Sequence, residues 1–131
     1  MFFAIEPSNG LAIYDQIVRQ VKFAVAGGAL RTGETIPSVR ELARELAVNP
    51  NTVARAYREL QADGVLEPIR GTGMEIASGA VARCRAERRR LIRQRLRGVL
   101  EEAKRGYLTI DELRELVDSE MAAIAQEGSA P

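Results

Sequence analysis

A single well-bounded helix, predicted between Asn49 and Gly64, constrains this chain more than any other feature of its sequence. Asn49 is a favourable N-cap, and Pro50 suits the first helical position because its missing N–H is not needed there. Gly64 stands where a residue in the left-handed conformation ends a helix. Apolar residues recur at i, i+3, i+4 and i+7 and form one stripe, namely Val53, Ala56, Tyr57 and Leu60. One face of this helix is therefore predicted to be buried in a core.

The opposite face of this helix is short, polar and cationic. At about 100° per residue, Asn51, Arg55 and Arg58 lie on that side, and Thr52 lies on the flank near the N-terminus. Side chains of these kinds reach phosphates and base edges in a major groove of DNA. The alternative is that the two arginines only form a solvated surface, and the neighbouring helices are needed to decide between the two interpretations.

A second, shorter helix is predicted directly before this one. Ser38 and Glu41 match the capping box, in which each side chain satisfies an otherwise unpaired amide of the other residue. The inward-facing residues of the short helix are Val39, Leu42, Ala43 and Leu46. Only Ala47 and Val48 separate it from the N-cap of the next helix, and this tight junction is typical of a helix-turn-helix.

A longer helix is predicted ahead of this pair, from about Leu11 to Ala26. Its apolar stripe consists of Ile13, Ile17, Val21, Ala24 and Val25. Asp15, Arg19 and Lys22 are expected to face outward. Two glycines end the helix, and residues 29–36 are expected to form a loop.

Two brief strands are predicted after the helices, at residues 65–69 and 74–77. Pro68 favours an edge position because proline cannot donate to a strand ladder. Three helices followed by a two-stranded hairpin predict a winged helix-turn-helix domain that covers residues 1–78.

The loop of this hairpin contains Gly71 and Gly73, and turn geometry alone is one explanation for them. A functional explanation is that bare glycine backbone lets the wing approach DNA closely. Arg70 would then be placed to reach the minor groove or a phosphate.

Residues 79–131 are predicted to form a separate helical hairpin. A long helix from about Val81 to Arg105 is followed by a second capping box, and a last helix runs to about Ala125. A hairpin this small cannot bury both of its apolar stripes alone, so we predict dimerisation. The alternative is that the hairpin packs back on its own winged domain. The residues predicted to form the dimer interface are Leu91, Ile92, Leu96, Val99, Leu100, Leu113, Leu116, Val117, Met121 and Ile124.

The long helix also carries a run of arginines from Arg83 to Arg97. Three interpretations are ranked in this order: a solvated face, ion pairs with acidic residues of the last helix in the same or a partner chain, and contacts with phosphates that flank the DNA site. The acidic candidates are Glu112, Glu115, Asp118 and Glu120.

Composition excludes several classes of function. The formal net charge is only +1, so a nucleic-acid role must be argued from where the charges lie. The chain has no histidine and one cysteine, which removes most metal sites and the usual nucleophile and base pairs. We therefore expect no enzyme, no metal and no cofactor. No apolar run is long enough to span a membrane and no signal-peptide pattern is present, so a cytoplasmic location is expected.

Several of these segments together resemble the winged-helix domain of the GntR family of bacterial transcription regulators: Ile13-Tyr14-Asp15-Gln16-Ile17, residues 36–43, residues 48–53, Ala56-Tyr57, Leu60 and Gly64. The Asn-Pro-Asn-Thr-Val pattern and the short two-helix tail resemble its YtrA subfamily. The resemblance implies a homodimer that binds a palindromic operator, usually as a repressor. It implies DNA contacts from Ser38, Arg40, Asn49, Asn51, Thr52, Arg55, Gly71 and Gly73, and helical geometry adds Arg58.

The chain also departs from the family pattern. Many GntR proteins have arginines where this chain has Pro50 and Ala54, and a threonine and an aromatic residue where it has Met74 and Glu75. Base readout and wing contacts are therefore expected to differ. With residues 80–131 alone after the winged region, no large effector-binding domain is expected, and the effector stays unknown. The favoured function is a DNA-binding transcription regulator, and the alternative is a protein-interaction or oligomerisation module that does not bind DNA.

Overall fold

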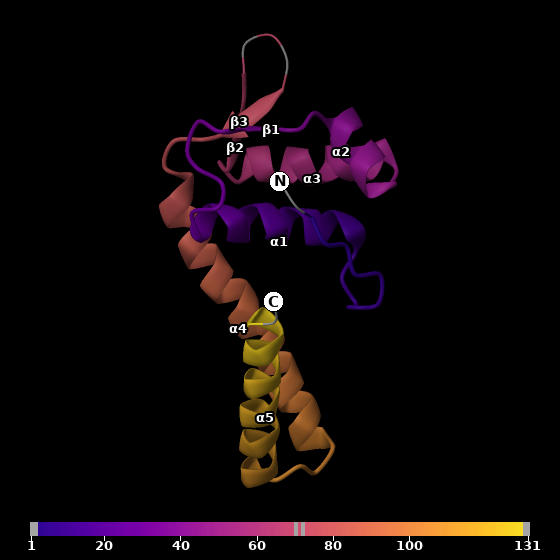
Figure 1. The fold of residues 1–131 in the computed structure, drawn as a ribbon, viewed down its shortest axis with the longest axis vertical. Helices are drawn as coiled ribbons and strands as arrows, with labels where there is room; N and C mark the ends of the chain where they lie inside the picture. Colours follow the sequence, from indigo (N-terminus) through magenta and orange to yellow (C-terminus); the bar gives the residue numbers. More distant parts are fainter. Residues whose placement is uncertain (1–2, 70, 72, 130–131) are drawn as a thin grey trace. The chain divides into compact units, whose positions relative to one another are not determined.

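The computed structural model describes residues 3–69, 71 and 73–129, and within them the chain is mainly helical with one small sheet (Figure 1). The elements in order are α1 (Ile13–Ala26), β1 (Thr35–Ile36), α2 (Val39–Leu46), α3 (Pro50–Ala62), β2 (Leu66–Pro68), β3 (Met74–Ile76), α4 (Ala80–Arg105) and α5 (Ile110–Ser129). They form two compact units, Met1–Leu91 and Ile92–Pro131, and α4 contributes to both. The predicted winged helix-turn-helix followed by a two-helix hairpin is confirmed.

The local signals that bound α2 and α3 act as the sequence predicts. The hydroxyl of Ser38 accepts a hydrogen bond from the Glu41 amide at 3.1 Å, and the Glu41 carboxylate accepts one from the Ser38 amide. The side-chain oxygen of Asn49 accepts a hydrogen bond from the Asn51 amide at 2.8 Å, which caps α3. Between the two helices Ala47 adopts a left-handed conformation with φ +54°, and this residue turns the chain sharply.

One hydrophobic core fills the first unit. α1 and α3 lie side by side, and the apolar stripe of α3 is buried against α1, α2 and the sheet (Figure 1). Val53, Ala56 and Leu60 are completely buried, and Tyr57 is 4% exposed. The stripe predicted from spacing in α3 is therefore confirmed, and its burial directs the polar face of the helix outward.

The sheet has three strands where two were predicted. β1 lies in the segment expected to be a loop, and the strand order is β1-β3-β2 with antiparallel pairing throughout. β1 consists of two residues, with Ile36 buried, and the Ile76 amide donates to the Glu34 carbonyl at 2.9 Å. A strand this short has no periodicity to detect. Pro68 lies on the edge strand β2, as predicted.

Lys22 was expected to face outward, and this was wrong. Its side chain is only 7% exposed, and its ammonium lies 2.8 Å from a carboxylate oxygen of Asp63 and 3.6 Å from one of Glu87. Burial of a lysine is tolerated when it is paired, and here the pairing joins α1 to the end of α3 and to α4. The Arg90 guanidinium hydrogen-bonded to Glu87, aided by nearby Lys22, lowers the pKa of that carboxyl.

The first turns of α4 belong to the winged unit. Ala80 and Cys84 are buried in its core, and the units divide after Leu91 instead of at residue 79, where the sequence analysis placed the boundary. The reason is that the helix begins on the core and only later leaves it, so no loop marks the division.

Two arginines of α4 bind the ends of other helices, a role absent from the three interpretations of the arginine run. Arg83 donates to the carbonyl of Asp63, the C-cap of α3, and Arg85 donates to the carbonyl of Ala26 at the end of α1, both at 3.3 Å. Cations are favourable at helix C-termini because the last carbonyls lack partners. Gly64 has φ +75°, a left-handed conformation that favours glycine, and the end of the Arg83 side chain lies where a β-carbon would stand.

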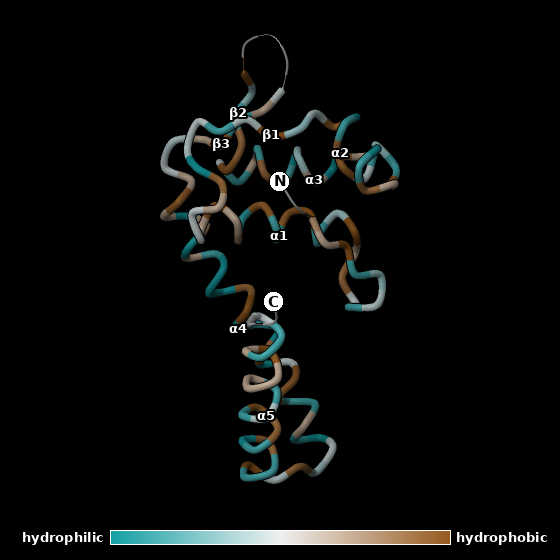
Figure 2. Tube along the Cα trace, viewed as in Figure 1, coloured by the Kyte–Doolittle hydropathy of each residue, from teal (hydrophilic) through white to brown (hydrophobic). Residues whose placement is uncertain are grey.

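The second unit pairs the end of α4 with α5. The predicted second capping box is present, since Thr109 accepts from the Glu112 amide at 3.1 Å and Glu112 accepts from the Thr109 amide at 3.2 Å. α5 continues to Ser129, beyond the predicted end at Ala125. Figure 2 shows apolar and polar residues alternating along α5, and many of the apolar ones are exposed.

Leu60→Ala is expected to lower the free energy of unfolding by ~2–5 kcal/mol, because the deleted side chain leaves a cavity among fully buried neighbours. Chemical denaturation followed by circular dichroism measures the change. Ile13→Ala is the matched control, since Ile13 is 37% exposed and its truncation should cost about 1 kcal/mol or less. Equal losses in the two variants would contradict the core assignment.

Candidate nucleic-acid interface

The outward face of α3 presents the side chains that its sequence predicts. Asn51, Arg55 and Arg58 are exposed, and Thr52 is half-buried on the flank. These residues occupy the first three turns of the helix, which is the part that reads base edges in a helix-turn-helix. The face can therefore offer amide and guanidinium groups to a major groove.

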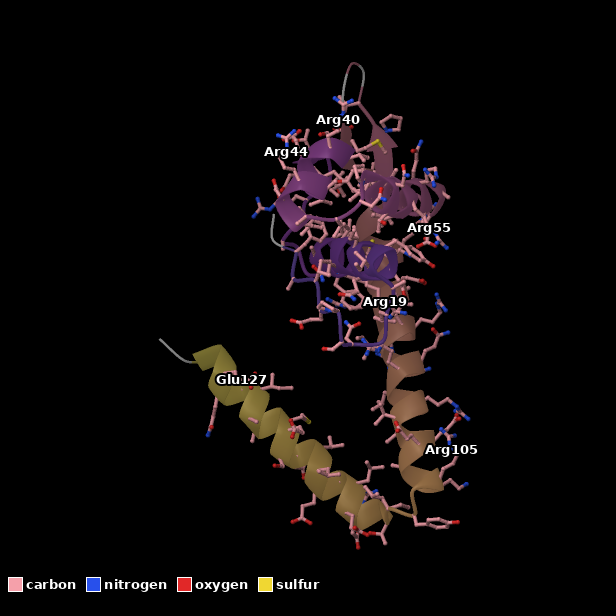
Figure 3. All side chains as sticks on the ribbon, turned by 90° about the vertical axis from the view of Figure 1, so that its right-hand side faces the viewer. Arg19, Arg40, Arg44, Arg55, Arg105 and Glu127 are labelled. Atoms are coloured by element: carbon pink, nitrogen blue, oxygen red, sulfur yellow. The ribbon has the colours of Figure 1, made fainter. Side chains whose placement is uncertain are left out.

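α2 adds two exposed arginines next to this helix. Arg40 and Arg44 lie one turn apart and project from α2 into solvent (Figure 3). The hydroxyl of Tyr57 on α3 donates a hydrogen bond of 2.7 Å to the carbonyl of Pro37, directly before α2. Burial, with nearby Glu45 and Glu41, raises the pKa of the Tyr57 phenol, so this donor keeps its proton. Tyr57 thus fixes the start of α2, and with it Arg40, relative to α3.

Ser38 and Asn49 each cap a helix, and both are also predicted to contact DNA. Each uses its side-chain oxygen to cap a helix, as described above, so that oxygen is already engaged as an acceptor. The amide N–H₂ of Asn49 and the hydroxyl proton of Ser38 remain as donors. Any contact to an acceptor on DNA would use these atoms.

The tip of the wing lies between β2 and β3. Arg70, predicted to contact DNA, lies outside the described residues. Gly71 and Gly73 are exposed and have φ values of +110° and +99°, and a β-carbon at either position would meet no atom within 4 Å. Backbone conformation therefore accounts for both glycines, and the open surface leaves their backbone accessible.

Arg55 has a partner that the sequence analysis missed. Its guanidinium carbon lies 3.7 Å from the centre of the Tyr14 ring, which comes from the first turn of α1. Figure 3 shows Arg55 on the flank of the unit that also carries Arg19 of α1. Packing of α1 on α3 creates this contact between residues distant in sequence, so spacing within either helix could not predict it.

The residues predicted to mediate dimerisation are mostly exposed in the single chain. Leu91 is buried and Leu113 is half-buried. The remaining eight are between 38% and 64% exposed: Ile92, Leu96, Val99, Leu100, Leu116, Val117, Met121 and Ile124. Both α4 and α5 therefore expose large apolar side chains in the single chain.

Other kinds of site receive no support within the described residues. No group of three or more Cys, Asp or Glu side chains there gathers as metal ligands. None of the helices in that part of the chain combines the length and apolar character of a bilayer span.

Comparison with known proteins places the chain in a family of bacterial regulators. The family model described as "Bacterial regulatory proteins, gntR family" matches residues 13–76. The HTH-type transcriptional repressor YtrA of Bacillus subtilis is 34% identical over 113 residues, which cover 86% of this chain and 87% of that protein.

Solved structures are similar across both units. A GntR family transcriptional regulator from Listeria monocytogenes is 26% identical with a TM-score of 0.67, over 86% of this chain and 97% of that one. YtrA from Sulfolobus acidocaldarius, a GntR-family transcription factor, is 29% identical with a TM-score of 0.56, over 79% of this chain and 97% of that one.

The fold and its cationic face define a DNA-binding transcription regulator of the winged helix-turn-helix class. The chain belongs to the GntR family, and its similarity to YtrA extends well beyond the winged domain. The family and this relative are transcription regulators, not enzymes.

Proposed function

We propose that the protein is a homodimeric repressor that binds a palindromic operator in the cytoplasm. The observation that carries this proposal is the exposed polar face of α3, with Asn51 and Arg55 on it and Arg40 beside it on α2. The similar protein from Bacillus subtilis is named a transcriptional repressor, which supports the direction of regulation. Repression would be steric, because a bound dimer occupies the promoter.

We propose that a few side chains recognise the base sequence of the operator. Asparagine amides pair with adenine, arginine guanidinium groups pair with guanine, and a threonine hydroxyl can contact either, so the proposed base readers are Asn51, Thr52, Arg55 and Arg40. The remaining predicted contacts are proposed to position the protein on the DNA backbone, and they are Ser38, Asn49, Arg58, Arg70, Gly71 and Gly73. Two copies would place one α3 in each of two successive major grooves, about 34 Å apart.

Dimerisation is proposed through the hairpin of the second unit. Its exposed apolar residues on α4 and α5 would otherwise remain in water at a cost of ~25 cal/mol per Å². A second copy offers the same surface, so a two-fold interface can cover both. The two-fold axis would also match a palindromic operator.

Selection of bound sequences from random double-stranded DNA tests the proposal. The expected result is a palindromic consensus, with an affinity that falls about 10³-fold between 50 and 200 mM salt because counterions are released from several phosphates. A scrambled sequence of equal length is the control. Absence of enrichment at low salt would contradict DNA binding and favour a protein-interaction module.

Asn51→Ala should weaken binding of the selected consensus by ~1–3 kcal/mol for each base contact it removes. Binding of scrambled DNA should be nearly unchanged, because the amide carries no charge. Fluorescence anisotropy with both DNAs gives the two affinities. Gln61→Ala removes a similar exposed amide from the last turn of α3 and should leave both affinities intact. If Asn51→Ala lowered the affinity for both DNAs equally, Asn51 would contact only the DNA backbone.

Met121→Asp should raise the dimer dissociation constant at least about tenfold, because a carboxylate placed in an apolar interface loses its hydration once in each copy. Met121 is 64% exposed in the single chain, so the fold itself should tolerate the change. Light scattering over a dilution series measures the assembly. Ala122→Asp adds the same charge about 100° around α5 and is the control. A monomeric wild type would contradict the dimer.

A further inference from the structure

The contact between Arg55 and Tyr14 joins the recognition helix to α1. The Arg55 guanidinium carbon lies 3.7 Å from the ring centre, which is van der Waals contact with the face of the ring. Tyr14 is half-buried and packs against the core, so its ring has a fixed place. Arg55 itself is exposed. An exposed cationic side chain is thus in contact with an aromatic ring that packs on the core.

Arg55 has a competing partner that it does not use. Glu59 lies four residues later on the same helix, and an ion pair at that spacing is a common arrangement for an exposed arginine. Among the ion pairs formed by the described residues, none involves Arg55, whereas Arg19 of α1 pairs with Asp15 at 3.3 Å at the same four-residue spacing. Arg55 therefore keeps its charge free of a carboxylate.

The chemistry of the stack leaves the arginine able to bind. A guanidinium stacks through its flat face, and its N–H donors point outward in the plane of the group. Stacking on Tyr14 thus leaves donors for a guanine edge or a phosphate oxygen. Because the side chain is already ordered, less rotamer entropy is lost when DNA binds.

We propose that Tyr14 is a positioning residue for DNA recognition, whose ring holds the Arg55 guanidinium in the place from which it contacts DNA. The inference rests on the proposed function, because it requires that Arg55 touch DNA. It adds a residue of α1, outside the helix-turn-helix itself, to the determinants of operator specificity.

Tyr14→Leu tests the proposal, because leucine keeps apolar packing but has no aromatic face. Loss of the stack should weaken operator binding by about two- to fivefold per half-site, and so by about tenfold for a dimer on two half-sites. Tyr14→Phe keeps the ring and should retain wild-type affinity. Ile13→Ala alters an exposed neighbour on α1 and is the control for general effects on that helix.

A double-mutant cycle separates positioning from structure. In an Arg55→Ala background, Tyr14→Leu should have no further effect on operator affinity, since the positioned group is gone. Specificity is measured as the ratio of affinities for the consensus and for a site changed at the base pair opposite Arg55. This ratio should fall in Tyr14→Leu and keep its wild-type value in Tyr14→Phe. Equal effects of Tyr14→Leu with and without Arg55 would assign Tyr14 a structural role only and overturn the proposal.

A measurement on the unaltered chain covers the case in which Tyr14→Leu does not fold. Nuclear magnetic resonance of the Arg55 side chain should show an upfield ring-current shift in the free protein and in the DNA complex. Loss of that shift in the complex would overturn the inference alone. Absence of any DNA binding by the wild type would overturn the proposed function, and the inference with it.

Discussion

Burial of one face of α3 is the constraint on which the rest of the winged unit depends. Val53, Ala56 and Leu60 are removed from water completely, and this burial fixes the rotation of the helix about its axis. Once that rotation is set, Asn51 and Arg55 have to face outward. The same buried face carries the Tyr57 hydroxyl, whose hydrogen bond to the Pro37 carbonyl ties the segment before α2 to α3. Packing of the core thus also positions the side chains that are proposed to bind DNA.

Features of the fold that depend on neighbouring residues could be predicted from sequence, and features that depend on distant partners could not. The caps at Ser38, Asn49 and Thr109 are formed within three residues, so their patterns bound the helices correctly. β1 was missed because its two residues pair with β3, far along the chain. Lys22 was misplaced for the same reason, since its carboxylate partner Asp63 is on another helix.

The candidate site follows the same division. Which residues of α3 face outward follows from helical spacing, and the structure agrees for all of them. How those side chains are held does not follow from spacing. The stack of Arg55 on Tyr14 depends on how closely α1 approaches α3, and the placement of Arg40 depends on a hydrogen bond from Tyr57 to the loop before α2. Local sequence thus predicts which residues are the proposed base readers, whereas the positions of their side chains depend on tertiary packing.

The near-neutral net charge is consistent with DNA binding, because the arginines differ in their partners. Arg83 and Arg85 are used inside the first unit, where they satisfy helix-end carbonyls, and Arg97 pairs with Glu101 at 2.9 Å within α4. Cations on α2 and α3 are few, so these two helices of one copy offer DNA a modest electrostatic attraction. Joining two copies of the chain would let the second copy bind at a high effective concentration. In the proposed dimer, affinity for DNA would therefore depend on the hairpin that joins the two copies, and specificity would depend on a few positioned side chains such as Arg55.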